Sequence, residues 1–150
     1  MPQSLSYILV HLIFSTKDRY PWLVSGIRQH THAFLAGTVR QCHCEAYRVG
    51  GVADHVHVAI GLSRTVAVAD LVKEIKAASS KWVKLQDNSL KDFAWQQGYG
   101  AFSVGMSQKD SLLHYIDHQE EHHKTRTFQV EFRAILTKYG IDYDERYVWD

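Results

Sequence analysis

Apolar and polar residues alternate along the segment 54–62, a pattern that is typical of a β-strand. Val56 and Val58 fall on one face of such a strand, because side-chain direction reverses at every residue. His55 and His57 fall on the opposite face, about 7 Å apart at the usual rise of a strand. We therefore expect the apolar face to pack under helices and the other face to present two imidazoles.

Similar patterns predict the rest of a small sheet. Alternation predicts strands over 6–16 and 42–49. Spacings of three, four and seven between apolar residues predict helices over 24–40 and 68–85. An aromatic, glycine-rich loop over 93–104 is expected to lead into a last strand. Gly50 and Gly51 predict a flexible corner before the histidine strand. The second face of the first strand, with His11 and Ile13, is mixed, so we expect another subunit or a ligand to cover part of it.

The order β-α-β-β-α-β predicts an α+β fold of the ferredoxin-like or RRM-like class. In this split βαβ arrangement an antiparallel sheet carries helices on one face. We expect one domain over 1–150 with the sheet core at about 4–105, a tyrosine-bearing helix at about 108–122, and a C-terminal helix and tail at about 127–150.

The helix that follows the sheet is expected to begin at a capping box formed by Ser107 and Asp110. Tyr115 and Gln119 are four residues apart, so they share one face of this helix. A second helix is predicted from Phe128 to about Tyr139, with Gly140 as its stop.

The composition excludes several classes of protein and site but does not by itself assign a function. The 150 residues are 45% hydrophobic, and no run of 18 apolar residues or basic leader is present, so we expect a soluble cytoplasmic domain without a membrane segment. The 17 Lys and Arg residues nearly match the 16 acidic residues, so a nucleic-acid surface requires local segregation of charge. Cys42 and Cys44 are too close for an ordinary disulfide and have no partner pair for zinc, which favours reduced thiols.

The paired histidines and the Tyr/Gln helix fit one kind of chemistry. A divalent metal held by His55, His57 and the Gln119 amide oxygen keeps positions open for the oxygens of a phosphodiester. His118 or His122 are alternatives to Gln119 as the third ligand. Tyr115 is then the nucleophile, since phenolate is a far better leaving group than an alkoxide and allows strand joining by transesterification. Each residue also has a purely structural interpretation: the histidines can be half-exposed strand residues, and the tyrosine can be a packing residue.

The order of four motifs carries a family resemblance. They are Asp54-His55-Val56-His57, the aromatic and glycine-rich block 95–104, Tyr115-Ile116-Asp117-His118-Gln119, and the segment 140–147. Together they resemble the small single-tyrosine HUH transposases of bacterial insertion sequences with hairpin ends. The likeness spans nearly the whole chain.

This resemblance implies transposition through single-stranded DNA, with cleavage leaving a 5′-phosphotyrosine and a free 3′-hydroxyl. It implies that Tyr115 is the nucleophile and that His55, His57 and Gln119 bind Mg²⁺ or Mn²⁺. It also implies a homodimer, with active sites completed in trans, that binds a DNA hairpin. We expect the hairpin to be gripped by Lys17, Arg19, Lys73, Lys76 and Lys81, with Tyr99 stacking on a base.

Three alternatives remain open. A domesticated relative that processes repeated chromosomal hairpins would keep the same residues. A rolling-circle initiator shares the chemistry but usually carries a larger second region, for which this chain has no room. A non-enzymatic RNA-binding domain would place aromatic residues on the central strands, where this chain has His11, His55 and His57.

Overall fold

The computed structural model describes residues 2–150 and contains an antiparallel sheet with the strand order β2-β3-β1-β4. The strands are β1 (Leu9–Ser15), β2 (Glu45–Gly51), β3 (His55–Gly61) and β4 (Gly100–Val104). The helices are α1 (Ser25–Gln41), α2 (Val68–Gln86), α3 (Lys109–Asp117), α4 (Gln119–His122) and α5 (Phe128–Lys138), and the 3₁₀ turns are η1 (Lys17–Arg19), η2 (Asn88–Leu90) and η3 (Met106–Gln108). Met1 of the predicted domain lies outside the described residues.

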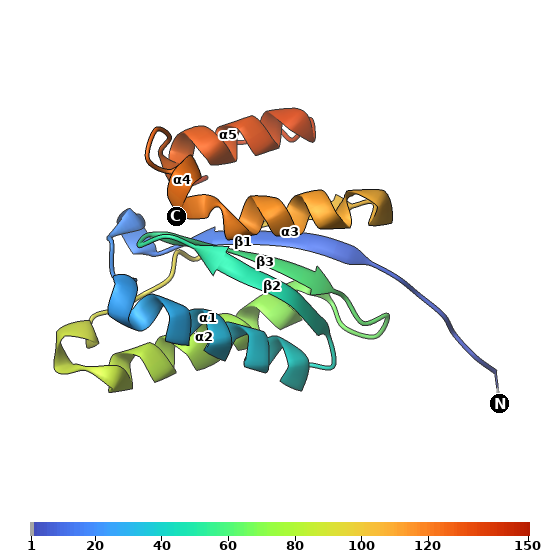
Figure 1. Cartoon of the computed structure of the whole chain (residues 1–150), viewed down its shortest axis with the longest axis horizontal. Helices are drawn as coiled ribbons and strands as arrows, with labels where there is room; N and C mark the ends of the chain where they lie inside the picture. Colours follow the sequence, from blue (N-terminus) through green and yellow to red (C-terminus); the bar gives the residue numbers. More distant parts are fainter. Residues whose placement is uncertain (1) are drawn as a thin grey trace.

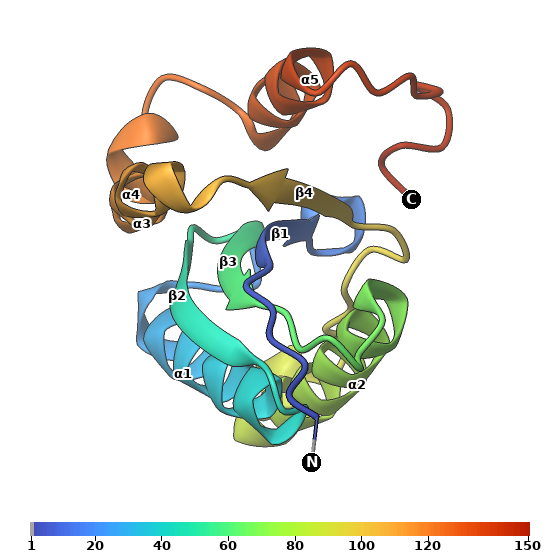
Figure 2. The same ribbon diagram turned by 90° about the vertical axis from the view of Figure 1, so that its right-hand side faces the viewer.

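The two faces of the sheet are covered by different helices. Figures 1 and 2 show α1 and α2 on one face and the C-terminal helices α3, α4 and α5 on the other. Val56, Val58 and Ile60 of β3 are buried in the main apolar core on the α1 and α2 face. The predicted α+β class and the predicted faces of the histidine strand are therefore confirmed.

The second face of β1 is covered by the same chain. Ile13 packs in a cluster with Phe128 and Phe132 of α5, and Leu9 packs in another with Leu112 and Ile116 of α3. The expectation that another subunit or a ligand covers this face was therefore wrong. The mixed character of the face arises because His11 lies between the two apolar clusters, where it faces a polar site.

The antiparallel pairing of β2 with β3 that the Gly50 and Gly51 corner suggested is confirmed. The position of the corner was wrong, because both glycines lie within β2. A Cβ atom at Gly50 would lie only 2.5 Å from the backbone oxygen of Ile116, so the glycine allows α3 to approach the backbone of β2. Gly51 has a φ of +152°, a conformation that residues with side chains rarely adopt. Both glycines serve close packing within the strand.

The segment that was predicted as one helix from 108 to 122 is divided. α3 ends at Asp117, His118 has non-helical dihedral angles, and α4 begins at Gln119. The predicted capping box was also wrong, because Gln108 is the N-cap residue and makes no side-chain capping bond. Ser107 belongs instead to the preceding turn η3.

The second C-terminal helix is confirmed. α5 ends at Lys138, and Gly140 follows with a φ of +65°, as expected for a glycine stop. Cys42 and Cys44 are both free thiols. Cys42 is the C-cap residue of α1, and β2 begins only at Glu45, so neither cysteine lies on the predicted strand. Within residues 2–150, no helix is long and apolar enough to cross a membrane.

Candidate functional site

The four predicted chemical residues meet on the face of the sheet under α3, α4 and α5. His55 and His57 of β3 are fully buried. Gln119, at the start of α4, places its Oε1 3.1 Å from His55 Nε2. The ring of Tyr115, from α3, has its centroid 5.6 Å from that of His57. One chain thus brings these residues together without a contribution from a partner subunit.

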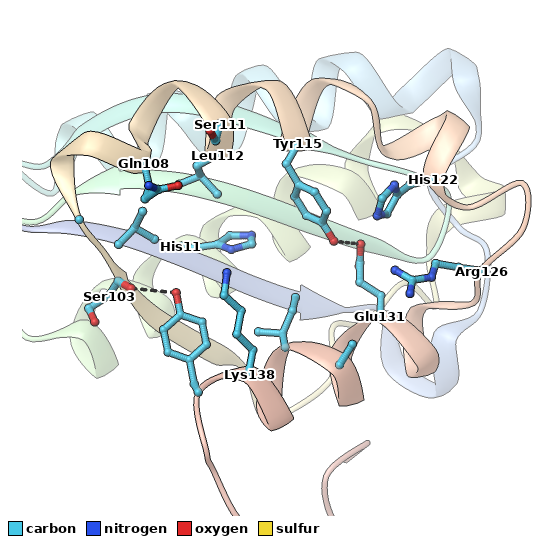
Figure 3. A pocket seen from close by; sticks show the side chains of 15 residues that line it. His11, Ser103, Gln108, Ser111, Leu112, Tyr115, His122, Arg126, Glu131 and Lys138 are labelled. Carbon is cyan, nitrogen blue, oxygen red and sulfur yellow. Dashed lines mark hydrogen bonds between the residues drawn. The ribbon is translucent and has the colours of Figure 1, made fainter.

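Glu131 lies at the centre of this group, although the sequence reasoning did not select it. Its side chain projects from α5 and is only 2% exposed. Oε1 lies 3.1 Å from His57 Nε2 and 3.4 Å from His55 Nε2. The Tyr115 hydroxyl donates a hydrogen bond to Oε2 (Figure 3). A buried carboxylate requires such partners, because desolvation of an isolated charge is very unfavourable.

His123 is the third imidazole of the group. Its Nε2 lies 3.2 Å from Glu131 Oε2 and 3.0 Å from Gln119 Oε1. The two histidines that were offered as alternatives to Gln119 lie elsewhere: the exposed His118 bonds through Nδ1 to the carbonyl of His114, and His122 lies against the edge of Tyr115. The interruption at His118 separates α4 from α3, and His123, four residues after Gln119, faces the site instead.

Hydrogen bonds behind the imidazoles fix their orientation. His55 Nδ1 donates to the carboxylate of Asp54 at 2.7 Å, and His123 Nδ1 donates to the carbonyl of Arg126 at 2.8 Å. His57 Nδ1 and His11 Nε2 share a hydrogen bond of 2.8 Å. Each Nε2 atom is therefore directed at the same small volume, an arrangement that outer hydrogen bonds commonly impose on metal-binding histidines.

Burial and charge set the protonation of the site. Burial lowers the pKa of His57 to about 4. Burial also opposes the charge on His55, but hydrogen bonds to Asp54 and Glu131 raise its pKa to about 9. Burial likewise acts against the charge on Glu131, yet the hydrogen bonds with the three imidazoles hold its pKa well below the ordinary value. Burial and the charge of Glu131 raise the pKa of Tyr115, so its hydroxyl keeps its proton at neutral pH.

A cavity of about 580 Å³ opens beside Tyr115, between α3 and α5 (Figure 3). Tyr115, His122 and Glu131 lie at one end of it. Its lining also includes His11, Ser103, Gln108, Arg126, Lys138 and Tyr139. The phenol is thus reachable from an open, partly cationic hollow.

Comparison with known proteins identifies the family to which the chain belongs. A family model described as "Transposase IS200 like" matches residues 4–119. The chain belongs to this transposase family. The predicted resemblance to single-tyrosine transposases is therefore confirmed.

Individual relatives of this transposase agree with the family assignment. The ISDra2 transposase TnpA of Deinococcus radiodurans is 25% identical over 116 residues, which cover 74% of this chain and 83% of that protein. A solved transposase structure from Deinococcus radiodurans has a TM-score of 0.62 at 23% identity, over 79% of this chain and 98% of the other. A REP-associated tyrosine transposase solved with a REP hairpin has a TM-score of 0.60 at 16% identity, over 82% of this chain and 74% of the other. These two structural likenesses show a shared fold.

The family implies a divalent metal, and the residues of this transposase fit one. His55, His57, His123 and Glu131 offer ligand atoms that all lie within 4.8 Å of one another. His55 and His123 each donate a proton from Nδ1 to an outer acceptor, so a neutral ring turns the Nε2 lone pair inward. Those lone pairs meet the oxygens of Glu131 and Gln119, which are also acceptors. These facing acceptor atoms require either a bound cation or additional protons between them.

The predicted DNA contacts of this transposase do not gather around Tyr115. Lys73, Lys76 and Tyr99 line a shallow hollow along α2, a helix on the other side of the sheet, and Lys81 is exposed on the same helix. The Lys76 ammonium donates to three carbonyl groups of residues 96–98, so it holds the loop before β4.

The remaining two predicted contacts lie in η1. Lys17 is exposed there, and the Arg19 guanidinium lies 5.7 Å from the ring centroid of Trp149. Arg126 and Lys138, which were not predicted, are the cationic residues beside the cavity at Tyr115.

The missed residues had weak signals in the sequence. Glu131 falls three residues after Phe128 and four before Ile135, so it interrupts the apolar stripe of α5 with a charge. His123 follows Gln119 by four residues, the spacing that places two side chains on one helical face. A charge on an apolar stripe predicts a buried polar partner, which is the signal that could have found Glu131.

Proposed function

We propose that this transposase cleaves and rejoins single-stranded DNA at hairpin-marked element ends through a 5′-phosphotyrosine on Tyr115. The observation that carries the proposal is the convergence of Tyr115, the two strand histidines and Gln119 on one face of the sheet, with Tyr115 also lining an open cavity. The family supplies the assignment to transposition. The geometry supports Tyr115 as nucleophile, because its side chain lines the cavity and its hydroxyl is hydrogen-bonded to the polar cluster through Glu131.

The cavity beside Tyr115 is the proposed entry of the DNA strand. Arg126 and Lys138 in its lining offer positive charge to phosphate groups. Tyr139 adds an aromatic ring, on which an unpaired base can stack. This combination of cationic and aromatic groups matches the chemistry of a single strand.

His55, His57 and Gln119 are the proposed ligands of Mg²⁺ or Mn²⁺. When bound, the cation supplies Lewis-acid polarisation of the phosphate that is attacked. Asp54 and His11 keep the two histidine rings oriented, because each bonds to the Nδ1 atom that points away from the site.

The protein's own residues account for the movement of the proton. The Tyr115 hydroxyl already donates to Glu131 Oε2, so the carboxylate takes the proton as the phenol oxygen bonds to phosphorus. The bond from phosphorus to the 3′ oxygen breaks, and the proton is available to that departing oxygen. A second 3′-hydroxyl reverses the sequence on the phosphotyrosine, and the phenol leaves again, because a phenol, with an ordinary pKa of about 10, is a better leaving group than an alcohol. No nucleotide triphosphate is consumed.

A homodimer remains part of the proposal, with each Tyr115 acting on the metal site of its own subunit. The close approach of Tyr115 and His57 within one chain supports this cis arrangement over the expected completion in trans. Mixing Tyr115→Phe protein with His57→Ala protein tests the point. The cis arrangement predicts that the mixture stays inactive, whereas restored cleavage through heterodimers would establish the trans arrangement.

The test of the function is a covalent adduct. Purified protein is incubated with hairpin-bearing single-stranded DNA and Mn²⁺, and the modified residue is mapped by mass spectrometry. We expect an adduct on Tyr115 that is absent in Tyr115→Phe and retained in the control Tyr147→Phe, which changes a tail residue that is 63% exposed. Binding without any adduct would sink the proposal and favour the non-enzymatic alternative.

A second measurement separates the related enzymes. Joining of two element ends is expected of a transposase, whereas a rolling-circle initiator returns to its own origin. The structural neighbour solved with a REP hairpin makes processing of repeated chromosomal hairpins the alternative substrate. Cleavage of such repeats with no joining of insertion-sequence ends would favour the domesticated relative.

A further inference from the structure

We infer that Glu131 and His123 are additional ligands of the divalent metal, so that the site is built from three imidazoles and a carboxylate beside Gln119. The inference rests on the proposed metal chemistry, and it changes the composition and the selectivity of the site. Both residues lie beyond the segment 4–119 that the family model matches. They come from α5 and from the turn after α4.

The separations between donor atoms carry the first step. Neighbouring ligands about a common ion, each about 2.1 Å from it, lie roughly 3.0 to 3.4 Å apart. Glu131 Oε1 lies 3.1 Å from His57 Nε2 and 3.4 Å from His55 Nε2. His123 Nε2 lies 3.2 Å from Glu131 Oε2 and 3.0 Å from Gln119 Oε1. The added residues therefore have the spacing of ligands.

The orientation of His123 carries the second step. Its Nδ1 donates to the carbonyl of Arg126, an atom that only accepts, so in the neutral ring Nε2 is unprotonated. His55 has the same arrangement, with Asp54 as the outer acceptor. The protein thus prepares His123 for a cation in the way that it prepares His55.

The position of Glu131 carries the third step. Phe128 and Phe132 flank it on α5, and both are buried in the apolar cluster that attaches α5 to the sheet. A carboxylate buried among apolar side chains loses its hydration, which is unfavourable unless another group compensates its charge. Its nearest polar groups are the three imidazoles and the Tyr115 hydroxyl, and none of these is a lysine or arginine with a permanent positive charge. A divalent cation supplies that charge.

The ligand set also determines which ion is preferred. Imidazole nitrogens suit Mn²⁺ and later transition metals, whereas Mg²⁺ prefers oxygen ligands and retains its waters. Three nitrogen donors therefore favour Mn²⁺ over Mg²⁺ more strongly than the two strand histidines alone. The carboxylate adds affinity for either ion through its charge.

The experiment measures metal binding to the full chain without DNA, by calorimetric titration with Mn²⁺. Glu131→Gln and His123→Ala are each expected to weaken Mn²⁺ binding by at least about tenfold. Two matched controls should bind as the unmodified protein does: Glu121→Gln changes an exposed carboxylate on α4, and His122→Ala removes the neighbouring imidazole. His55→Ala serves as the reference for a lost ligand.

The outcomes separate the inference from the proposed function. Unchanged or tighter Mn²⁺ binding in Glu131→Gln, with binding lost in His55→Ala, would overturn the role of Glu131 and leave the strand-histidine site intact. Unchanged binding in His123→Ala would overturn the role of His123. Unchanged binding in His55→Ala would instead contradict the proposed metal site itself.

Spectroscopy of the unmodified protein tests the same ligands without depending on whether a variant folds. Electron spin-echo spectroscopy of Mn²⁺ bound to the unmodified protein reports the coordinated imidazole nitrogens directly. Three coordinated imidazoles are expected, and a count of two would overturn the role of His123. A shift of the carboxylate signals on metal binding, followed by infrared spectroscopy with isotope-labelled glutamate, is expected if Glu131 binds, and its absence would overturn that role.

Discussion

The two faces of the sheet differ in what their buried residues do. Toward α1 and α2, the core is apolar and includes Leu12 and Phe14 of β1 together with Val56 and Val58 of β3. Toward α3, α4 and α5, the same two strands present His11, His55 and His57. Neighbouring residues on one strand thus serve separate purposes, since one face stabilises the fold and the other holds reactive groups in place.

The polar face is positioned by packing at its two sides. One apolar cluster joins Ile13 to α5, and another joins Leu9 to α3. The histidines lie between these clusters, so the helices that carry Tyr115 and Glu131 are attached on either side of the site. The division between the faces predicts that most changes will affect either stability or chemistry, and that changes under α5 will affect both.

The largest expected effect comes from His57→Ala. Loss of this imidazole should reduce strand cleavage by roughly three orders of magnitude or more, because groups that act as a unit fail together. Cleavage of a labelled hairpin substrate in single-turnover conditions measures it. Val58→Ala, the next residue on the strand, is the control and should retain cleavage per folded molecule. Equal losses of cleavage in both variants would contradict the conclusion that one face of the sheet serves the chemistry and the other the stability.

Ile75→Ala on α2 should have the next largest effect, on stability alone. Ile75 is fully buried in the main core, so its truncation is expected to lower the free energy of unfolding by about 2–5 kcal/mol. Urea denaturation followed by circular dichroism measures the change. Mn²⁺ affinity should stay the same below the unfolding transition.

Leu136→Ala on α5 sharpens the same comparison. Leu136 is buried in the cluster that attaches α5, so a loss of stability of similar size is expected. Cleavage should fall as well, because α5 carries Glu131. Full cleavage activity in this variant would mean that the packing of α5 is not needed to place the carboxylate.

Asp54→Ala should have an intermediate effect. Its carboxylate accepts from His55 Nδ1, and loss of such an outer hydrogen bond typically costs 10- to 100-fold, roughly, in metal affinity or activity. Calorimetry with Mn²⁺ measures the affinity, and the melting temperature reports the fold. A fall in melting temperature with unchanged affinity would assign Asp54 to the structure alone.

Acid should destabilise the protein partly through His32 on the α1 side. Burial, aided by the charge of Arg28, lowers the pKa of His32 to about 4, below its ordinary value of 6.5. As pH falls from 6.5 to 4, the unfolded chain binds this proton first, so stability decreases. His32→Asn should remove a loss on the order of 1 kcal/mol, measured by urea denaturation at both pH values. An unchanged slope would assign the acid sensitivity to His11 and His57, whose pKa values are also lowered.

The smallest effect is expected from Lys138→Ala. If this lysine contacts a phosphate in the cavity, DNA binding should weaken a few-fold and the slope of log affinity against log salt should fall by about 1. Fluorescence anisotropy at several salt concentrations measures both. Lys81→Ala, on the opposite side of the sheet, is the comparison. A greater loss of DNA affinity in Lys81→Ala would instead indicate that the DNA strand binds on the α2 side of the sheet.

Local patterns were sufficient for most of the helices and strands and for the strand histidines, although they did not predict the division of the helix over 108–122. The alternation around His55 and His57 predicts which face carries them, because period two is a property of the strand itself. The apolar stripe of α5 was visible because a helix has its own period of 3.6 residues, and Gly140 marked its stop.

Contacts between distant segments were not predictable from these patterns. Glu131 reaches His57 across 74 positions of sequence, and no local rule pairs them. The choice of His123 over His122 depends on the interruption at His118, which turns the following residues by an amount that periodicity does not give. The cover of β1 depended on the docking of α3 and α5, which a mixed strand face does not specify.

The absence of a side chain at Gly50 sets the height of the nucleophile above the sheet. The backbone of Ile116 rests on the place that a methyl group would occupy, and Ile116 directly follows Tyr115. A single added carbon atom there would raise α3 and withdraw the phenol from the imidazoles below it. The reach of the reactive hydroxyl thus depends on the smallest residue of the neighbouring strand β2, which pairs with His57 in the sheet.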